Sequence, residues 1–212
     1  MAKRQSGRGN GLKRRRGTRR TKRTFLVLCE GAVTEPEYLY ALRSLREVNE
    51  VASVEIRVDR ARSGKVPLPL VEAAIEVKEQ IEEVDEVWCL FDVEAPQPHP
   101  NLAQALARAR NNGIEIAVSN PCFEIWLALH FDKHNAWLSS DEAVRLRQRR
   151  DGSTGKEVDG QRYMPLRDRA VQNARDLSDS HAKNGKSFPR DNPSSGVYRL
   201  LEAIERGTSK GS

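Results

Sequence analysis

Two apolar runs of this sequence end on carboxylates. Residues 24–29 lead into Glu30, and residues 87–91 lead into Asp92 and Glu94. A short apolar run that stops at a turn residue predicts a buried β-strand, and an acid directly after it lies where the sheet opens to solvent. If the two strands are neighbours, these three carboxylates share one site.

Carboxylates gathered at one edge of a sheet repel one another, and a divalent cation removes the repulsion. An Asp-x-Glu pair with another acid nearby, and no cluster of His or Cys, favours Mg²⁺ or Mn²⁺ over zinc. Asp92 and Glu94 would hold the cation, with Glu30 as a further ligand or as the group that moves a proton in phosphate chemistry. Each motif alone is more often an acid at a turn, and only their matched placement supports the site.

The elements around these acids alternate between strand and helix. We expect strands at 24–29, 54–58, 87–91 and 114–118, and helices at 38–45, 70–81, 102–109 and after Pro121. Such alternation predicts a Rossmann-like α/β fold: a parallel sheet of about four strands with helices on both faces. Ligands of such sheets bind beyond the carboxyl ends of the strands. The common strand order 2-1-3-4 makes the first and third strands neighbours.

Helix start signals complete this picture. Thr34 and Glu37 have the spacing of a capping box at the start of the first helix. Pro121 suits the first position of the fourth helix, with Ser119 or Asn120 as its cap. Glu124 then lies in the first turn of that buried helix and points to the same edge as Glu30.

Beyond residue 134 the sequence is more polar, and its pattern predicts helices and no strand. We expect helices at 139–150 and 166–177, a loop at 178–193 and a last helix capped by Ser194. The predicted organisation is therefore a basic tail (1–23), an α/β core (24–134) and a C-terminal helical appendage (135–212).

The composition excludes several classes of protein. Of the 212 residues, 38% are apolar and 31% are charged. No apolar run approaches the roughly 20 residues of a membrane span, and no signal-peptide core follows the basic start. Cys29, Cys89 and Cys122 lack close metal-ligand spacing, so we expect core thiols in a reducing cytoplasm.

All of the basic excess lies in the N-terminal tail. The formal net charge is +6, but residues 1–23 hold eleven Lys or Arg and no acid, leaving 25 basic against 30 acidic groups elsewhere. We expect this tail to bind the phosphate backbone of a nucleic acid; the alternative is a solubilising extension without a specific partner. The predicted contacts are Arg14, Arg15, Arg16, Arg19, Arg20, Lys22 and Arg23.

Two other reactive side chains have simpler interpretations. His130 follows a buried helix and has no acid near it in sequence, so a packed histidine is favoured over a catalytic one. Cys122 lies where a helix N-terminus would favour a thiolate, but no basic residue is near it in sequence, and we interpret it as structural.

Three segments resemble the RloB-like family, which has a Toprim-type core. They are Cys29-Glu30-Gly31-Ala32-Val33-Thr34-Glu35, Phe91-Asp92-Val93-Glu94 and Ser119-Asn120-Pro121-Cys122-Phe123-Glu124-Ile125-Trp126-Leu127. The basic start and residues 192–195 fit as well, so the resemblance covers nearly the whole chain. It implies a Toprim-like fold, with Glu30 as general acid or base and Asp92 and Glu94 as magnesium ligands.

The resemblance carries further expectations and one departure. Toprim domains of topoisomerases, primases and OLD-type nucleases carry Asp-x-Asp after the third strand, whereas this chain has Glu94 at the second position. Glutamate keeps the charge but moves it outward, which is compatible with weaker or shifted metal binding. The resemblance also implies bacterial defence against phage, an AAA- or ABC-type ATPase partner, and cleavage of RNA, including tRNA, by related effectors.

The leading prediction is a metal-dependent nuclease that uses Mg²⁺ or Mn²⁺, with Glu30 and Glu124 as catalytic residues. The alternative is a non-catalytic module of the same fold that binds nucleic acid or docks on an ATPase. A receiver-like phosphoacceptor domain fits less well, since it needs paired acids after the first strand and a lysine late in the sheet. We expect a cytoplasmic protein without membrane contact, and a homo-oligomer is compatible with the sequence.

Overall fold

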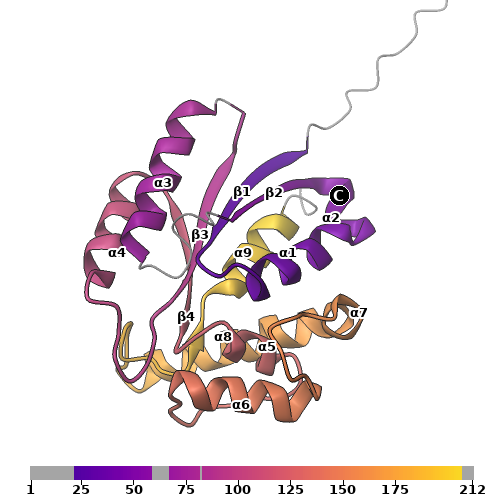
Figure 1. The fold of residues 1–212 in the computed structure, drawn as a ribbon, viewed down its shortest axis with the longest axis vertical. Coiled ribbons are helices and arrows are strands. Elements are labelled where there is room, and N and C mark those ends of the chain that lie inside the picture. Colours follow the sequence, from indigo (N-terminus) through magenta and orange to yellow (C-terminus); the bar gives the residue numbers. More distant parts are fainter. Residues whose placement is uncertain (1–21, 59–66, 82, 207–212) are drawn as a thin grey trace, which may run out of the picture.

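A five-stranded, mostly parallel sheet forms the centre of the protein (Figure 1). The structure is a computed structural model that describes residues 22–58, 67–81 and 83–206. The strands are β1 (Arg23–Cys29), β2 (Ala52–Val58), β3 (Glu86–Asp92), β4 (Glu115–Asn120) and β5 (Ser194–Ser195). Their order is β2-β1-β3-β4-β5, with β5 antiparallel to β4 and the other pairs parallel. The predicted α/β class and the order 2-1-3-4 are confirmed.

Helices cover both faces of the sheet (Figure 1). On one face lie α3 (Pro67–Gln80) and α4 (Leu102–Asn111), which pack on Leu26, Leu28 and Phe91. The helices that contribute to the core on the other face are α1 (Thr34–Ser44), α2 (Arg46–Val51), α5 (Glu124–Leu129), α6 (Ser140–Asp151), α7 (Gly160–Tyr163) with the short 3₁₀ turn Met164–Leu166, α8 (Arg167–Lys183) and α9 (Val197–Glu205). Because β1 and β3 are buried on both faces, their sequences are continuous apolar runs.

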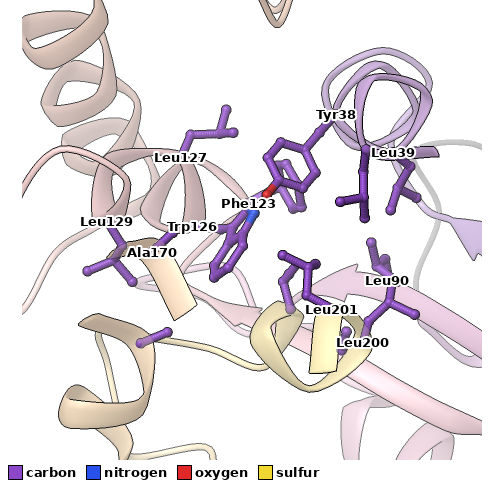
Figure 2. Packing of buried hydrophobic residues seen from close by; sticks show 14 of the residues in the cluster. Tyr38, Leu39, Leu90, Phe123, Trp126, Leu127, Leu129, Ala170, Leu200 and Leu201 are labelled. Carbon is purple, nitrogen blue, oxygen red and sulfur yellow. The ribbon is translucent and has the colours of Figure 1, made fainter. Parts of the chain in front are cut away.

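The C-terminal helices share the core of the sheet. Trp126 of α5, Tyr38 of α1 and Leu200 of α9 are all fully buried in one cluster (Figure 2). The Tyr38 and Trp126 rings meet edge to face, with centroids 5.9 Å apart. The boundary expected near residue 134 therefore crosses a continuous hydrophobic core, and the division into two units stays a prediction.

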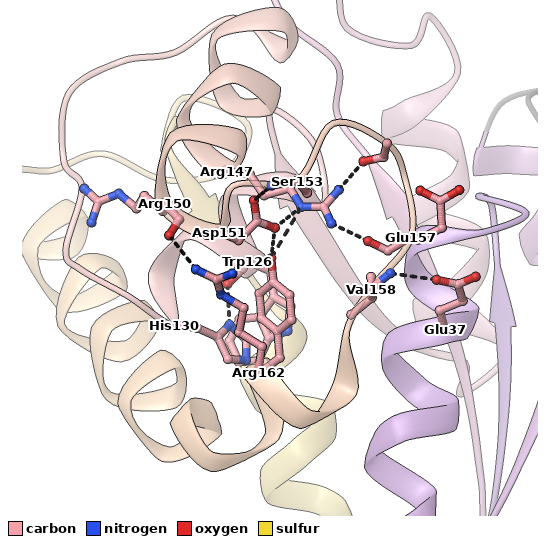
Figure 3. Close-up of polar contacts among 12 residues, drawn as sticks. Glu37, Trp126, His130, Arg147, Arg150, Asp151, Ser153, Glu157, Val158 and Arg162 are labelled. Atoms are coloured by element: carbon pink, nitrogen blue, oxygen red, sulfur yellow. Dashed lines mark hydrogen bonds and ion pairs between the residues drawn. The ribbon is translucent and has the colours of Figure 1, made fainter.

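An arginine is buried inside the C-terminal half (Figure 3). Arg147 of α6 donates to the Asp151 carboxylate (2.8 Å) and to the carbonyls of Gly155 (2.8 Å) and Glu157 (2.5 Å). The Tyr163 hydroxyl donates to the same carboxylate (2.5 Å). We call Arg147, Asp151 and Tyr163 the buried arginine network; it holds the segment after α6 against α7.

Three expectations about helix and strand boundaries were wrong. The C-terminal half does contain a strand, because Ser194 and Ser195 form β5. Ser194 is therefore no helix cap, and Gly196 precedes α9 instead. In addition, α8 continues to Lys183, six residues into the expected loop.

The expected caps at the other two helices are also absent. Val33 precedes α1 without a side-chain cap, and Glu37 accepts a hydrogen bond from the Val158 amide (2.7 Å) in a tertiary contact. Pro121 does not open a helix, because its carbonyl accepts from the Glu94 amide (2.9 Å); α5 begins three residues later. In both places a contact with a distant segment overrides the local signal.

Among the described residues, we find no helix that combines the length and apolar character of a bilayer span.

Candidate active site

The register of β1 and β3 brings the two acidic strand ends together. Cys29 lies opposite Leu90, and one residue further the Glu30 amide donates to the Leu90 carbonyl (3.0 Å). The Asp92 amide in turn donates to Oε2 of Glu30 (3.1 Å). Glu30 and Asp92 therefore lie side by side at the carboxyl edge of the sheet.

Five carboxylates interact electrostatically at this edge, and we call them the acidic cluster. Its members are Glu30, Glu35, Asp92, Glu94 and Glu124. Burial raises the pKa of Asp92 well above its usual range, and repulsion from the other four carboxylates raises it further. Asp92 is thus the member of the acidic cluster that is repelled by all four of the others.

Glu30 is held by two contacts besides its position in the chain. Its Oε1 lies 3.3 Å from Nε2 of His99, and its Oε2 accepts the Asp92 amide. Burial raises the pKa of Glu30, with a smaller contribution from Glu94, while the Asp92 amide and His99 oppose the rise. A carboxyl with a raised pKa that is held by donors is suited to proton transfer.

Glu35 is the deepest acid of the cluster, with 5% of its surface exposed. Its Oε1 accepts the Gly31 amide (3.1 Å), and a Cβ at Gly31 would displace the Glu35 carboxylate from this position. Burial, aided by repulsion from Glu124 and Glu30, raises the pKa of Glu35 to about 7. No ion pair to Glu35 is seen in the described part of the chain.

Glu94 has an unusual backbone conformation, with φ at 67° in the left-handed region. Such a conformation costs a residue other than glycine about 1–3 kcal/mol and persists only where neighbours enforce it. Here Ser140 of α6 donates its hydroxyl to Oε2 of Glu94 (2.5 Å) and accepts the Ala95 amide (3.1 Å). The C-terminal half thereby fixes the orientation of one predicted metal ligand.

Glu124 opens α5, as the sequence suggested, and it contributes to the repulsion on both Asp92 and Glu35. Cys122, two residues earlier, is buried, and burial followed by the charges of Asp92 and Glu124 raises the pKa of its thiol. A protonated, buried thiol agrees with a structural cysteine. Cys29 and Cys89 are likewise free and buried.

His130 is a packed histidine, as favoured from the sequence. It is fully buried, with Nε2 3.1 Å from the Tyr38 hydroxyl and Nδ1 3.0 Å from the Trp126 carbonyl. Burial lowers its pKa to about 4, so it is neutral at physiological pH.

Two of the predicted nucleic-acid contacts fall within the described residues. Lys22 donates to the side chain of Asn49 (3.2 Å). Arg23 belongs to β1, pairs with Glu86 and stacks over Phe25 at 5.0 Å from the ring centroid. The other predicted contacts, Arg14, Arg15, Arg16, Arg19 and Arg20, lie outside the described residues.

The donor atoms at this edge fit a hard cation. They are carboxylate oxygens, which suit Mg²⁺ or Mn²⁺, and the nearby thiol of Cys122 has a raised pKa. In the described ranges, however, no three His, Cys, Asp or Glu side chains already form a group that could hold an ion. Asp92 and Glu94 would hold such a cation, with Glu30 adjacent.

Sequence reasoning did not select Glu35 or His99 as site residues. Glu35 stands five positions after Glu30, and a signal for it existed in the glycine between them, which leaves room for a carboxylate. His99 lies in a proline-rich loop whose path cannot be read from the sequence. Its position depends on a hydrogen bond from its amide to the Val93 carbonyl (3.1 Å).

A family profile supports the resemblance noted from the sequence. The profile described as RloB-like protein matches residues 25–204, which spans β1 to α9. No curated protein and no solved structure matches this chain. The match covers most of the sequence and includes the whole acidic cluster, and the chain therefore belongs to the RloB-like family.

Proposed function

We propose that this protein is a metal-dependent nuclease with a Toprim-like active site. One observation carries the proposal: the acidic cluster surrounds Asp92 at the carboxyl edge of two neighbouring parallel strands. Mutual repulsion and burial make such a cluster costly unless a cation or protons neutralise it. A structural role alone gives no reason to gather five acids there.

The surroundings of each residue determine its proposed role in the reaction. Asp92 and Glu94 would hold Mg²⁺ or Mn²⁺, which when bound polarises a phosphoryl oxygen and stabilises the leaving oxygen. Glu30, with its raised pKa, moves the proton of the attacking water or of the leaving group. Glu124 assists from the start of α5. Glu35, whose pKa is raised to about 7, takes up a proton and so reduces the negative charge of the acidic cluster.

RNA, including tRNA, is the favoured substrate, and the basic tail would hold its phosphate backbone. A role in bacterial defence against phage, beside an AAA- or ABC-type ATPase, belongs to the same proposal. These parts are supported by the family resemblance and not by the geometry of the site.

The test is cleavage of total tRNA, other RNA and DNA by the full chain with Mg²⁺, with Mn²⁺ and with excess EDTA, followed by mapping of the product ends. We expect Glu30→Gln and Asp92→Asn to lower the rate by about a hundredfold or more while thermal unfolding remains cooperative. Asp85→Asn is the matched control, because Asp85 precedes the opposite end of β3 and accepts the Thr24 amide (2.7 Å). Full activity of either variant, or of the wild type in EDTA, would refute the metal-dependent mechanism at these residues. Binding of nucleic acid without any metal-dependent cleavage would favour the non-catalytic module.

A further inference from the structure

A cavity of about 420 Å³ lies beside the edge of β4 that β5 leaves uncovered. Residues of α4, α8 and α9 line it, together with Phe188, Asp191 and residues 194–196. We call this cavity the edge pocket. Its volume is in the range of small-molecule sites, and it lies outside the acidic cluster.

The backbone of β4 offers hydrogen-bonding groups to the edge pocket. Gly196 donates to the Val118 carbonyl (2.8 Å) on the β5 side, whereas the next carbonyl, of Ser119, accepts from Val93 on the β3 side (2.9 Å). Because successive peptide groups of a strand face opposite neighbours, the peptide groups of Ile116 face the pocket. β5 pairs only with Ser119 and Asn120 and does not reach them.

The walls of the edge pocket are apolar and partly aromatic. Leu106 of α4 and Ile116 of β4 line it together with Phe188 and Tyr198. The two aromatic side chains are half-buried, so part of each ring is available to a ligand. A planar ring that stacks on such side chains gains binding energy without a demand for one particular sequence of polar groups.

Two guanidinium groups line the same pocket. Arg199 stacks over Tyr198 at 5.5 Å from the ring centroid, and Arg110 of α4 makes no ion pair within the described segments. Both arginines are exposed and can donate in pairs to phosphate oxygens. Glu115 and Asp191 also line the pocket and supply acceptors for exocyclic amino groups.

We propose that the edge pocket binds a nucleoside phosphate, with the base against Tyr198 and Phe188 and the phosphate on Arg110 and Arg199. An added peptide strand is the competing occupant, but the free edge Glu115–Ala117 spans only about 10 Å, shorter than an ordinary strand. The nucleotide is either free or part of a nucleic-acid strand. This proposal does not depend on the nuclease activity proposed above.

The experiment is calorimetric titration of the full chain carrying Glu30→Gln with four ribonucleoside 5′-monophosphates, inorganic phosphate, the free nucleosides and a short oligoribonucleotide. We expect at least one monophosphate or the oligonucleotide to bind more tightly than phosphate or nucleoside. Tyr198→Ala and Arg199→Ala should each weaken that binding by about tenfold or more. If a monophosphate binds, the ligand of the edge pocket is a free nucleotide. If the oligonucleotide binds and no monophosphate does, the ligand is a nucleic-acid strand.

Two further variants distinguish binding in the edge pocket from a loss of folding and from binding to the basic tail. Ser178→Trp places a large side chain in the pocket without removing a contact group, and it should abolish binding while the protein stays folded. Tyr40→Ala is the control, because Arg43 stacks over Tyr40 at 4.6 Å on α1, away from the pocket. The proposal is overturned if no nucleotide binds, if Tyr40→Ala weakens binding as much as Tyr198→Ala, or if an acidic peptide binds the pocket instead.

Discussion

Glu35 has the environment of an acid that prefers to keep its proton. It is buried, its nearest charged neighbours are other carboxylates, and its pKa is raised from 4.5 to about 7. A folded state that holds a proton more tightly than the unfolded chain is favoured at low pH. The stabilisation from Glu35 is therefore complete below pH 4.5 and is lost as the pH rises through 7.

This difference predicts a pH dependence of stability. The shift corresponds to about 3 kcal/mol, so the free energy of unfolding should fall by roughly that amount between pH 4.5 and 8 because of Glu35. Glu35→Gln should remove this part of the fall and make the variant more stable than the wild type at pH 8. Urea unfolding at several pH values measures the free energy of unfolding of each protein. Glu37→Gln on the same helix, which keeps an oxygen for the Val158 amide, should retain the slope of the wild type. Equal slopes for all three proteins would contradict the assignment.

The central pair of the site could be predicted from the sequence, but its surroundings could not. Glu30 and Asp92 follow apolar runs, and parallel strands place their carboxyl ends at one edge, so local pattern and topology suffice. The burial of Glu35, the contact of His99 and the φ of Glu94 depend on segments far away in the chain. Ser140, which fixes Glu94, is 46 residues from it.

At the scale of elements, the sequence predicted the strands that have long apolar runs, but it did not predict the features that depend on tertiary contacts. The four parallel strands were located because buried strands have continuous apolar sequences. β5 was missed because its two residues, Ser194 and Ser195, carry no periodicity and pair only through the fold of the C-terminal half. The cap expected at Thr34 failed because Glu37 serves a tertiary hydrogen bond instead.

The buried arginine network joins α6, the following segment and α7, and that segment reaches α1 through the bond from Val158 to Glu37 (Figure 3). Removing Arg147 would leave the Asp151 charge buried and the carbonyls of Gly155 and Glu157 without a donor. Loss of one partner of such a buried pair costs about 3–5 kcal/mol. We expect Arg147→Ala to lower the free energy of unfolding by that amount.

Chemical unfolding in urea provides the measurement, and Arg149→Ala provides the control. Arg149 lies two residues further along the same helix but is exposed, so its removal should change stability by no more than about 0.5 kcal/mol. A loss below about 1 kcal/mol for Arg147→Ala would show that the network does not hold this region together.

At the scale of the whole molecule, charge is divided along the chain. Residues 1–23 hold eleven cations and no acid, whereas the rest holds 25 basic and 30 acidic groups. If a nucleic acid is the partner, as proposed, it would be attracted to the tail and repelled by the net charge of the remainder. Association driven by phosphate contacts weakens with salt, because each neutralised phosphate releases counterions.

Removal of residues 1–21 should thus lower both the affinity for RNA and its salt dependence. That segment holds nine cations, and each phosphate contact on a single strand contributes about 0.7 to the slope of log K against log salt, so the slope should decrease by up to about 6. Binding of the Glu30→Gln protein to an oligoribonucleotide between 50 and 200 mM salt, on the order of physiological ionic strength, measures this. Replacement of the seven arginines of residues 1–21 by lysine retains the charge and should retain the slope. If the truncated protein keeps the slope of the full chain, the phosphate contacts lie on the folded body, and the tail is only a solubilising extension.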